Sequence, residues 1–212
     1  EDKMPVVLSI YENRENPSFR ALFDRVFPVL EQKYSGRIEL LLVHAQIHIQ
    51  NGRWPEALET YLSAISMNPT NYALYQMAYS LSQQVGDVDG QIALLERIEE
   101  SFSADEDILE GLVYEYYIVE RWASCARLAT ARAQMTLDPE VAGNLYALAG
   151  TAWFQLDSFE LGTASYDKAL ELERSPTTLN NYAWDLATHE GNLEVALQLT
   201  IECNASVALE PT

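Results

Sequence analysis

The chain has 212 residues, and its 32 acidic and 13 basic residues give a formal net charge of -19 at pH 7. This charge repels the phosphates of nucleic acids, and the basic residues include only three lysines, too few to attract an anionic membrane surface. No apolar run reaches 18 residues, so we expect a soluble chain that does not insert into a membrane. The sequence does not distinguish a cytoplasmic from a periplasmic location.

A bulky or apolar residue recurs along the chain at intervals of 34 to 37 residues, and a mostly small residue follows it three positions later. An interval of this length accommodates two helices of about 12 to 15 residues and two tight turns. The sequence therefore predicts a single array of about six helix-turn-helix repeats over residues 1–212. The bulky positions are Phe19, Trp54, Val88, Trp122, Phe159 and Leu193. The approximate repeats are 3–37, 38–71, 72–105, 106–142, 143–176 and 177–212.

The predicted elements follow these repeats from the N-terminus. The first repeat is the weakest, because Pro28 falls inside its second helix. Later repeats carry short turns rich in Gly, Asn, Asp and Ser between their two helices. Prolines that end a repeat stand at Pro69, Pro139 and Pro176. The fourth repeat has extra residues before Pro139, which predicts a longer second helix there.

The second and fifth repeats resemble the tetratricopeptide repeat (TPR) family, whose signature has large, small and aromatic residues at fixed positions before a proline. The second supplies Leu41, Ala45, His48, Ala57, Tyr61 and Pro69, and the fifth supplies Tyr146, Gly150, Trp153, Gly162, Tyr166 and Pro176. The resemblance implies an all-α, right-handed superhelical solenoid. The last repeat is similar to those of bacterial members. Gln91 and Arg132 depart from the signature, because each stands at a position that is normally small.

Aromatic residues at the repeat positions are expected in the core, because stacked repeats bury their apolar faces against each other. These residues are Trp54, Tyr61, Trp122, Trp153, Phe159 and Tyr166. Cys125 and Cys203 lie 78 residues apart without a CxxC pattern, so we expect two small buried side chains and not a disulfide framework.

Two short patterns are compatible with a bound metal ion. His44 and His48 stand one helical turn apart, but HAQIH lacks the Glu of the zinc motif HExxH. Residues 85–96 match a calcium loop except at its first ligand, where Val85 stands, and the repeat explains Asp87 as a helix cap. No nucleophile elbow, phosphate loop or protease motif is present. We therefore expect a protein that is not an enzyme and has neither metal nor cofactor.

Family members bind their partners in a concave groove lined by the first helix of each repeat, and the resemblance implies the same here. The implied contact residues are Gln46, Gln76, Ser80, Gln83, Glu110, Tyr114, Tyr117, Thr151, Phe154, Asn181 and Asp185, with Leu42 and Tyr182 beside them. The absence of Lys and Arg argues against the clamp that some members close on acidic chaperone tails. Gln, Tyr, Phe and Glu suit a neutral-to-basic peptide. Tyr114, Tyr117 and Phe154 are the best-placed contacts, unless they pack on neighbouring helices.

Residues 96–120 hold nine acidic residues and one basic one. Such a run forms a solvated helix face or steers a basic partner towards the groove. The leading hypothesis is a scaffold that binds a protein or peptide. The alternative is a spacer or self-association module of a larger repeat protein, a homo-oligomer formed through terminal repeats such as the helix around Leu193 to Leu209. A metal-dependent enzyme or regulator comes last.

Overall fold

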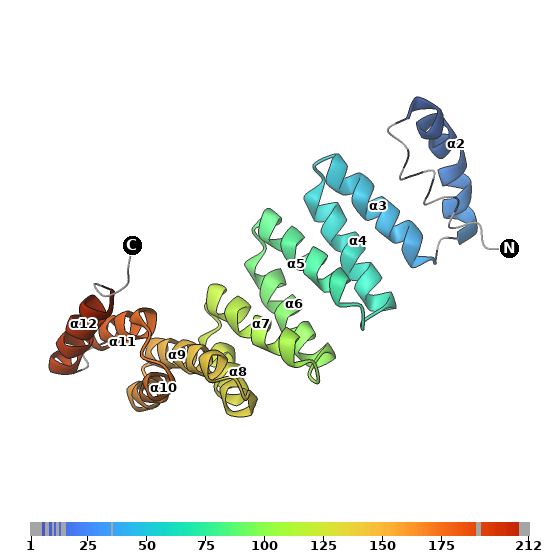
Figure 1. The fold of residues 1–212 in the computed structure, drawn as a ribbon. Helices are drawn as coiled ribbons and strands as arrows, with labels where there is room; N and C mark the ends of the chain where they lie inside the picture. Colours follow the sequence, from blue (N-terminus) through green and yellow to red (C-terminus); the bar gives the residue numbers. More distant parts are fainter. Residues whose placement is uncertain are drawn as a thin grey trace. The chain divides into compact units, whose positions relative to one another are not determined.

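The computed structural model describes residues 6, 9, 11, 13, 16–34, 36–189 and 192–207 (Figure 1). Eleven α-helices have both of their ends within this part of the chain, and none of its residues belongs to a strand. None of the described helices combines the length and the apolar character that crossing a bilayer requires. The chain divides into two compact units, an N-terminal unit of residues 1–101 and a C-terminal unit of residues 102–212.

The N-terminal unit contains two complete helix pairs after a first helix. Its core near the start joins aromatic residues of that first helix to Leu40 and Val43 of the next. Pro28 lies inside this helix, which corresponds to the predicted second helix of the first repeat, and the later pairs are connected through contacts between successive helices. The helices are α2 (Pro17–Tyr34), α3 (Ile38–Gln50), α4 (Trp54–Met67), α5 (Tyr72–Val85) and α6 (Val88–Ser101).

The C-terminal unit contains three helix pairs. The two helices of each pair contact each other, and α9 also contacts α8 of the preceding pair and α11 of the following one. This succession of pairs is the helical repeat solenoid that the sequence predicts. The helices are α7 (Glu106–Ile118), α8 (Trp122–Met135), α9 (Pro139–Gln155), α10 (Phe159–Leu172), α11 (Pro176–Thr188) and α12 (Leu193–Val207).

Polar caps and prolines fix where the first helices of the C-terminal unit begin. The Asp138 carboxylate accepts hydrogen bonds from the backbone N–H groups of Glu140 and Val141, and Pro139 occupies the first turn. Ser175 accepts a hydrogen bond from the backbone N–H of Thr178 in the same way, before Pro176. These side chains satisfy N–H groups that have no partner within the helix.

Small residues allow close contact between the helices of the fifth repeat, as the TPR resemblance implies. A Cβ atom on Gly150 would lie 2.7 Å from the Tyr166 ring, and one on Gly162 would lie 2.5 Å from the Phe154 ring. Tyr166 in turn stacks on Tyr182, with 4.6 Å between ring centroids. The glycines therefore make room for the aromatic core of this unit.

The aromatic positions of the repeat are less uniformly buried than the sequence predicts. Tyr61 and Tyr166 are buried, whereas the tryptophans at the repeat positions are half-buried. Phe159 is exposed, although its ring contacts the ring of Phe154 at 5.8 Å, so its assignment to the core was wrong. Cys125 is buried as predicted, and Cys203 is half-buried.

Two features of the fourth repeat differ from expectation. Its second helix, α8, has 14 residues, the same length as α4, α6 and α10, so the prediction of a longer helix was wrong. The extra residues belong to the following linker and to the first turn of α9, which begins at Pro139.

Arg132 is buried, and its guanidinium lies 3.4 Å from Glu106 and 3.9 Å from Glu110. A long side chain thus fits a small position by reaching the first helix of its own pair.

The calcium-loop interpretation of residues 85–96 was wrong. Val85 ends α5, and residues 88–96 are part of α6, so this stretch is not a loop. The Asp87 carboxylate accepts a hydrogen bond from the backbone N–H of Gly90 at 2.9 Å, which is the capping role that the repeat predicts. The described residues include no group of three or more His, Cys, Asp or Glu side chains that could hold a metal. His44 instead contacts the ring of Phe27.

Candidate peptide-binding site

The first helices of the C-terminal unit surround a cavity of about 160 Å³, which we name the α9 cavity. Four of the residues that the sequence assigns to a groove line it, namely Tyr114 and Tyr117 from α7, Thr151 from α9 and Asn181 from α11. These residues come from three helices that span residues 106–188, and the repeat brings them together. The other lining residues are Asn144, Ala147, Leu148, Thr177 and Thr178.

Helical spacing explains why these side chains share one surface. Asn144, Ala147, Leu148 and Thr151 stand three or four residues apart along α9. Residues at these spacings lie on the same face of a helix. None of the side chains that line the cavity is ionisable except the two tyrosines, so its wall is aromatic, hydroxyl and amide in character.

The two tyrosines differ in how firmly they are held. Tyr114 is 48% exposed, so its ring is available to a partner. Tyr117 is half-buried, and its ring meets the ring of Trp122 edge-on at 5.4 Å. Burial raises the pKa of the Tyr117 hydroxyl, and the nearby Asp185 and Cys125 raise it further. Tyr117 therefore stays neutral at physiological pH and forms a fixed part of the wall.

A buried hydrogen-bond chain lies behind the cavity wall. The Tyr166 hydroxyl donates to the Asp185 carboxylate at 2.6 Å and lies 2.6 Å from the Thr151 hydroxyl. Because the phenol hydrogen is given to Asp185, Tyr166 accepts the hydrogen bond from Thr151. Burial raises the pKa of Asp185, whereas the hydrogen bond from Tyr166 acts in the opposite direction. This chain fixes the orientation of Thr151 in the cavity wall.

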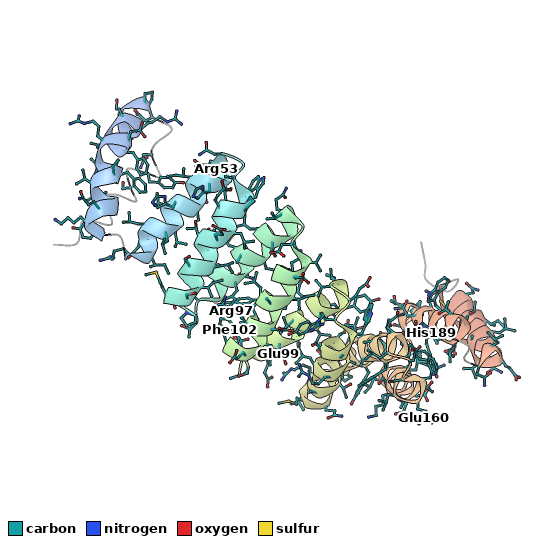
Figure 2. The ribbon with its side chains drawn as sticks, turned by 180° about the vertical axis from the view of Figure 1, so that it is seen from behind. Arg53, Arg97, Glu99, Phe102, Glu160 and His189 are labelled. Carbon is teal, nitrogen blue, oxygen red and sulfur yellow. The ribbon has the colours of Figure 1, made fainter. Side chains whose placement is uncertain are left out.

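Two residues assigned to the groove lie in the core instead. Phe154 is fully buried, and its ring contacts those of Phe159, Tyr166, Tyr182 and His189, the last of which is labelled in Figure 2. Its assignment as a peptide contact was wrong, because packing between repeats covers it.

Asp185 is 3% exposed and acts as the acceptor for Tyr166, so its assignment to the groove surface was also wrong. Glu110 is half-buried, with its carboxylate 3.9 Å from Arg132. The remaining assigned residues belong to the N-terminal unit. Gln46 is half-buried on α3, whereas Gln76, Ser80 and Gln83 are exposed on α5.

Trp184 is an exposed residue of α11 that the sequence reasoning missed. Its side chain is 67% exposed, and it stands one turn after Asn181. Four residues separate α11 from α12, whereas three separate α9 from α10. Counting back from the last residues of α9 and α11 therefore aligns Thr151 with Trp184. Counting back from the first residues of the helices that follow, Phe159 and Leu193, aligns Thr151 with Asp185 instead. The four residues HEGN, one more than the LDS before Phe159, were the signal in the sequence.

Three helix pairs with short turns, and first helices that share one lined surface, define a TPR-like helical repeat protein. Comparison with solved structures supports this fold class. A structure of MamA (MSR-1) is 18% identical, with a TM-score of 0.57, and the match covers 81% of this chain and 97% of that one. YrrB, described as a TPR protein with an unusual peptide-binding site, is 11% identical, with a TM-score of 0.54 and coverages of 86% and 94%.

A third similar structure is the APC/C hetero-tetramer Cut9–Hcn1. The matched chain is 14% identical, with a TM-score of 0.50, and the match covers 98% of this chain and 41% of that one. No family model and no curated protein matches the sequence. At these identities the likeness establishes the fold, and function has to be argued from the site itself.

Proposed function

We propose that this chain is a non-enzymatic scaffold that binds a segment of another protein at the α9 cavity. The observation that carries the proposal is the convergence of Tyr114, Tyr117, Thr151 and Asn181 on one cavity. The TPR resemblance assigns the same four residues to the groove on the sequence alone. YrrB offers a precedent at the level of the fold, since it is described as having a peptide-binding site.

The chemistry of the cavity favours a peptide. Tyrosine rings supply contact area at low cost in conformational entropy, and the amides of Asn144 and Asn181 are able to bond the N–H and C=O groups of an extended backbone. A volume of about 160 Å³ suits one side chain of the partner. With no charged side chain lining it, the cavity suits an apolar or small polar side chain.

The charge of the C-terminal unit favours a neutral-to-basic partner. Residues 102–212 contain 18 acidic and 5 basic residues, a net charge of -13. A field of this sign accelerates the encounter with a basic segment and weakens as salt is added. The uncharged cavity therefore makes the contact, and the acidic unit around it supplies the long-range attraction.

A catalytic role for the thiol next to this site is disfavoured. Cys125 is fully buried, and burial raises the pKa of its thiol to about 12. A thiol with this pKa remains protonated near neutral pH, and only the thiolate is a good nucleophile.

Affinity capture tests the proposal, with the chain as bait in a lysate of its source cells. The Tyr114→Ala, Asn181→Ala double variant removes two cavity side chains, and Leu161→Ala is the matched control, because Leu161 is an exposed apolar residue on a second helix. We expect a partner that the wild type and the control retain and the double variant loses. Equal capture by all three would refute the assignment of the cavity.

Self-association is a second candidate, which we propose from one observation. Leu193, Leu197 and Ile201 stand four residues apart on α12 and are each at least 60% exposed. Such a stripe is able to bury apolar area against a second copy. Because each copy carries a charge of -19, added salt should promote the association. Light scattering should show a mass that rises with concentration and salt for the wild type, but not for Leu197→Lys.

A further inference from the structure

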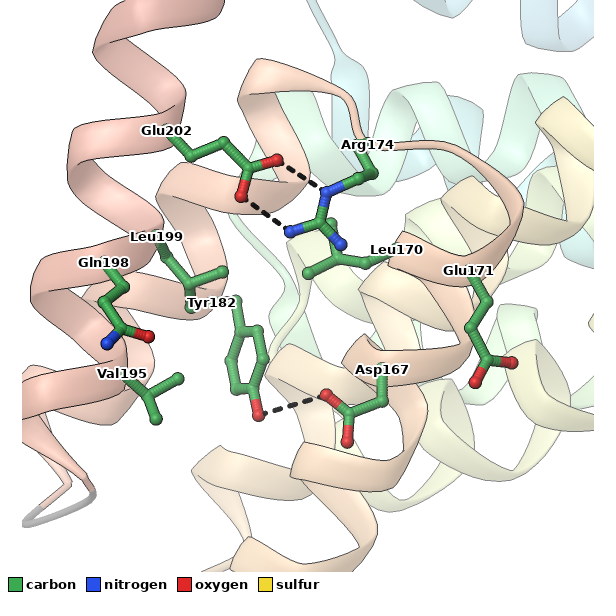
Figure 3. A pocket seen from close by; sticks show the side chains of 9 residues that line it. All are labelled: Asp167, Leu170, Glu171, Arg174, Tyr182, Val195, Gln198, Leu199 and Glu202. Carbon is green, nitrogen blue, oxygen red and sulfur yellow. Dashed lines mark hydrogen bonds and ion pairs between the residues drawn. The ribbon is translucent and has the colours of Figure 1, made fainter.

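A second and larger cavity lies among α10, α11 and α12, and we name it the α12 cavity (Figure 3). Its volume is about 440 Å³. Whereas the α9 cavity is lined by first helices, this one is lined mainly by the second helices of two successive repeats. It is thus separate from the proposed peptide site. The uncharged residues that line it are Leu170, Tyr182, Val195, Gln198 and Leu199.

One side of the α12 cavity is apolar. Leu170 from α10 and Leu199 and Val195 from α12 contribute aliphatic side chains, and Tyr182 from α11 lies between the two helices. The Tyr182 ring is held by its stacking on Tyr166. Aliphatic stems of long side chains bind to such surfaces while their polar ends stay in water.

The charged residues of the α12 cavity fall into two groups. At one end, the Arg174 guanidinium binds both carboxylate oxygens of Glu202, at 2.5 and 2.7 Å (Figure 3). This two-bond pairing lowers the pKa of Glu202. Arg174 and Glu202 therefore neutralise each other, and neither is free to bind a charged ligand without breaking the pair.

The other charged group consists of two carboxylates one helical turn apart on α10. Asp167 accepts only a long hydrogen bond, 3.5 Å, from the Tyr182 hydroxyl. Glu171 lines the same cavity, and in the described part of the chain neither carboxylate forms an ion pair. Lys168, which stands between them in sequence, lies over the ring of Tyr146. The cavity thus combines an apolar wall with two uncompensated negative charges.

We propose that the α12 cavity binds an organic cation with an aliphatic stem, a guanidinium or ammonium group whose stem lies along Leu170, Val195 and Leu199. The charged end pairs with Asp167 and Glu171. A lysine or arginine side chain of a partner protein and a free polyamine share this chemistry. The proposal does not depend on the α9 cavity, and it gives the chain a second binding site on different helices.

The test is a titration of ¹⁵N-labelled chain followed by NMR. The probes are N-acetylarginine N-methylamide, its neutral isostere made from citrulline, and spermidine. We expect saturable shifts of the backbone amides around Asp167 and Gln198 with a cation, which weaken as NaCl is raised, and no saturable shifts with the citrulline compound. The two cations are compared at high NaCl, where the general attraction of the trivalent amine to an acidic chain is screened. Tighter binding of spermidine there would identify a free polyamine as the source, and tighter binding of the arginine compound would identify a side chain.

Variants separate the proposed site from general attraction to an acidic protein. Asp167→Asn with Glu171→Gln should weaken binding about tenfold. Glu160→Gln is the matched control, because Glu160 is an exposed carboxylate at the start of the same helix (Figure 2) and does not line the cavity. It should bind the cation like the wild type.

The Arg174→Gln variant is expected to strengthen binding of the cation instead of weakening it. Removal of the guanidinium frees the Glu202 carboxylate and adds a third negative charge to the cavity, so binding of the cation should become about two- to fivefold tighter. Equal shifts with the citrulline compound, an unchanged affinity in the double variant, or weaker binding in Arg174→Gln would each overturn the proposal.

Discussion

The two units are built from the same repeat but present different residues on their first helices. In the N-terminal unit the groove positions hold Gln76, Ser80 and Gln83, all exposed on α5, and the unit carries 14 acidic and 8 basic residues, a net charge of -6. The C-terminal unit carries tyrosines, Tyr114 and Tyr117, at two of the three corresponding positions of α7, and its net charge is -13. The repeat therefore specifies the backbone, and residues that do not pack between helices are free to specialise one unit for binding.

The cores of the two units also differ, in the polar groups that they bury. Near α2 and α3, the N-terminal unit buries Phe23, Phe27, Leu30, Leu40 and Val43, a largely apolar cluster. The C-terminal unit instead buries a hydroxyl and a carboxylate among aromatic rings, through the Tyr166–Asp185 hydrogen bond. Buried polar groups fix one arrangement because every alternative leaves them without a partner. The Tyr166–Asp185 hydrogen bond thus fixes the packing behind the candidate site of the C-terminal unit.

The largest effect that we expect comes from Phe154→Ala. Phe154 is fully buried among four other rings, so its loss should lower the free energy of unfolding of the C-terminal unit by about 3–5 kcal/mol. Hydrogen exchange should show lost protection in α9 to α12 with little change in α3 to α5. Phe159→Ala is the control and should cost much less, because Phe159 is exposed. An equal loss of protection in both units would show that they unfold together.

Tyr166→Phe should have the next largest effect on stability. The variant keeps the ring stacked on Tyr182 but removes the hydrogen bond to Asp185, which leaves a buried carboxylate without this donor. The expected cost is about 1–3 kcal/mol in the free energy of unfolding. Urea denaturation followed by circular dichroism measures it. A cost near zero would mean that water or Thr151 replaces the phenol.

Much of the fold was predictable, because the spacing of large and small residues acts locally. Gly150 and Gly162 stand where the helices approach most closely, and prolines and caps mark the helix starts. The groove positions were predictable only in part. Relative to the start of the following helix, Asp185 stands at the position of Thr151, but four residues instead of three precede α12, so this register does not hold for α11. A shift of one residue moves a side chain by about 100° around a helix, from the surface occupied by Trp184 to the core position of Asp185.

Burial of Phe154 was not predictable for a different reason. A groove position is covered or open depending on how the neighbouring repeat packs, and the neighbours here contribute Tyr182 and His189. Nothing in the local sequence of α9 carries that information. The α12 cavity was missed as well, because its walls come mainly from α10 and α12, which are separated in the sequence by α11 and share no motif.

Paired substitutions at groove positions of the two units test the comparison between them directly. With the captured partner in hand, Tyr114→Ala with Asn181→Ala should weaken binding tenfold or more, as expected for truncated contacts in a small site. Gln76→Ala with Ser80→Ala should change the affinity by less than about twofold. Isothermal titration calorimetry measures both. The reverse ranking would move the binding site to the N-terminal unit.

The smallest expected effect is a change in the pH dependence of stability, caused by the ionisation of Asp185. Burial raises the pKa of this carboxyl in the folded protein above its value of about 3.9 in an unfolded chain. The folded state therefore binds the proton more tightly, so the contribution of Asp185 to stability is fully present below about pH 4 and is lost as pH rises through the folded pKa. Asp185→Asn keeps an oxygen acceptor for Tyr166 and removes the titrating group. The difference in unfolding free energy between wild type and variant should shift in favour of the variant from pH 3 to pH 7. A difference that stays constant over this range would mean that solvent reaches the carboxylate and that the cavity wall is looser than its contacts indicate.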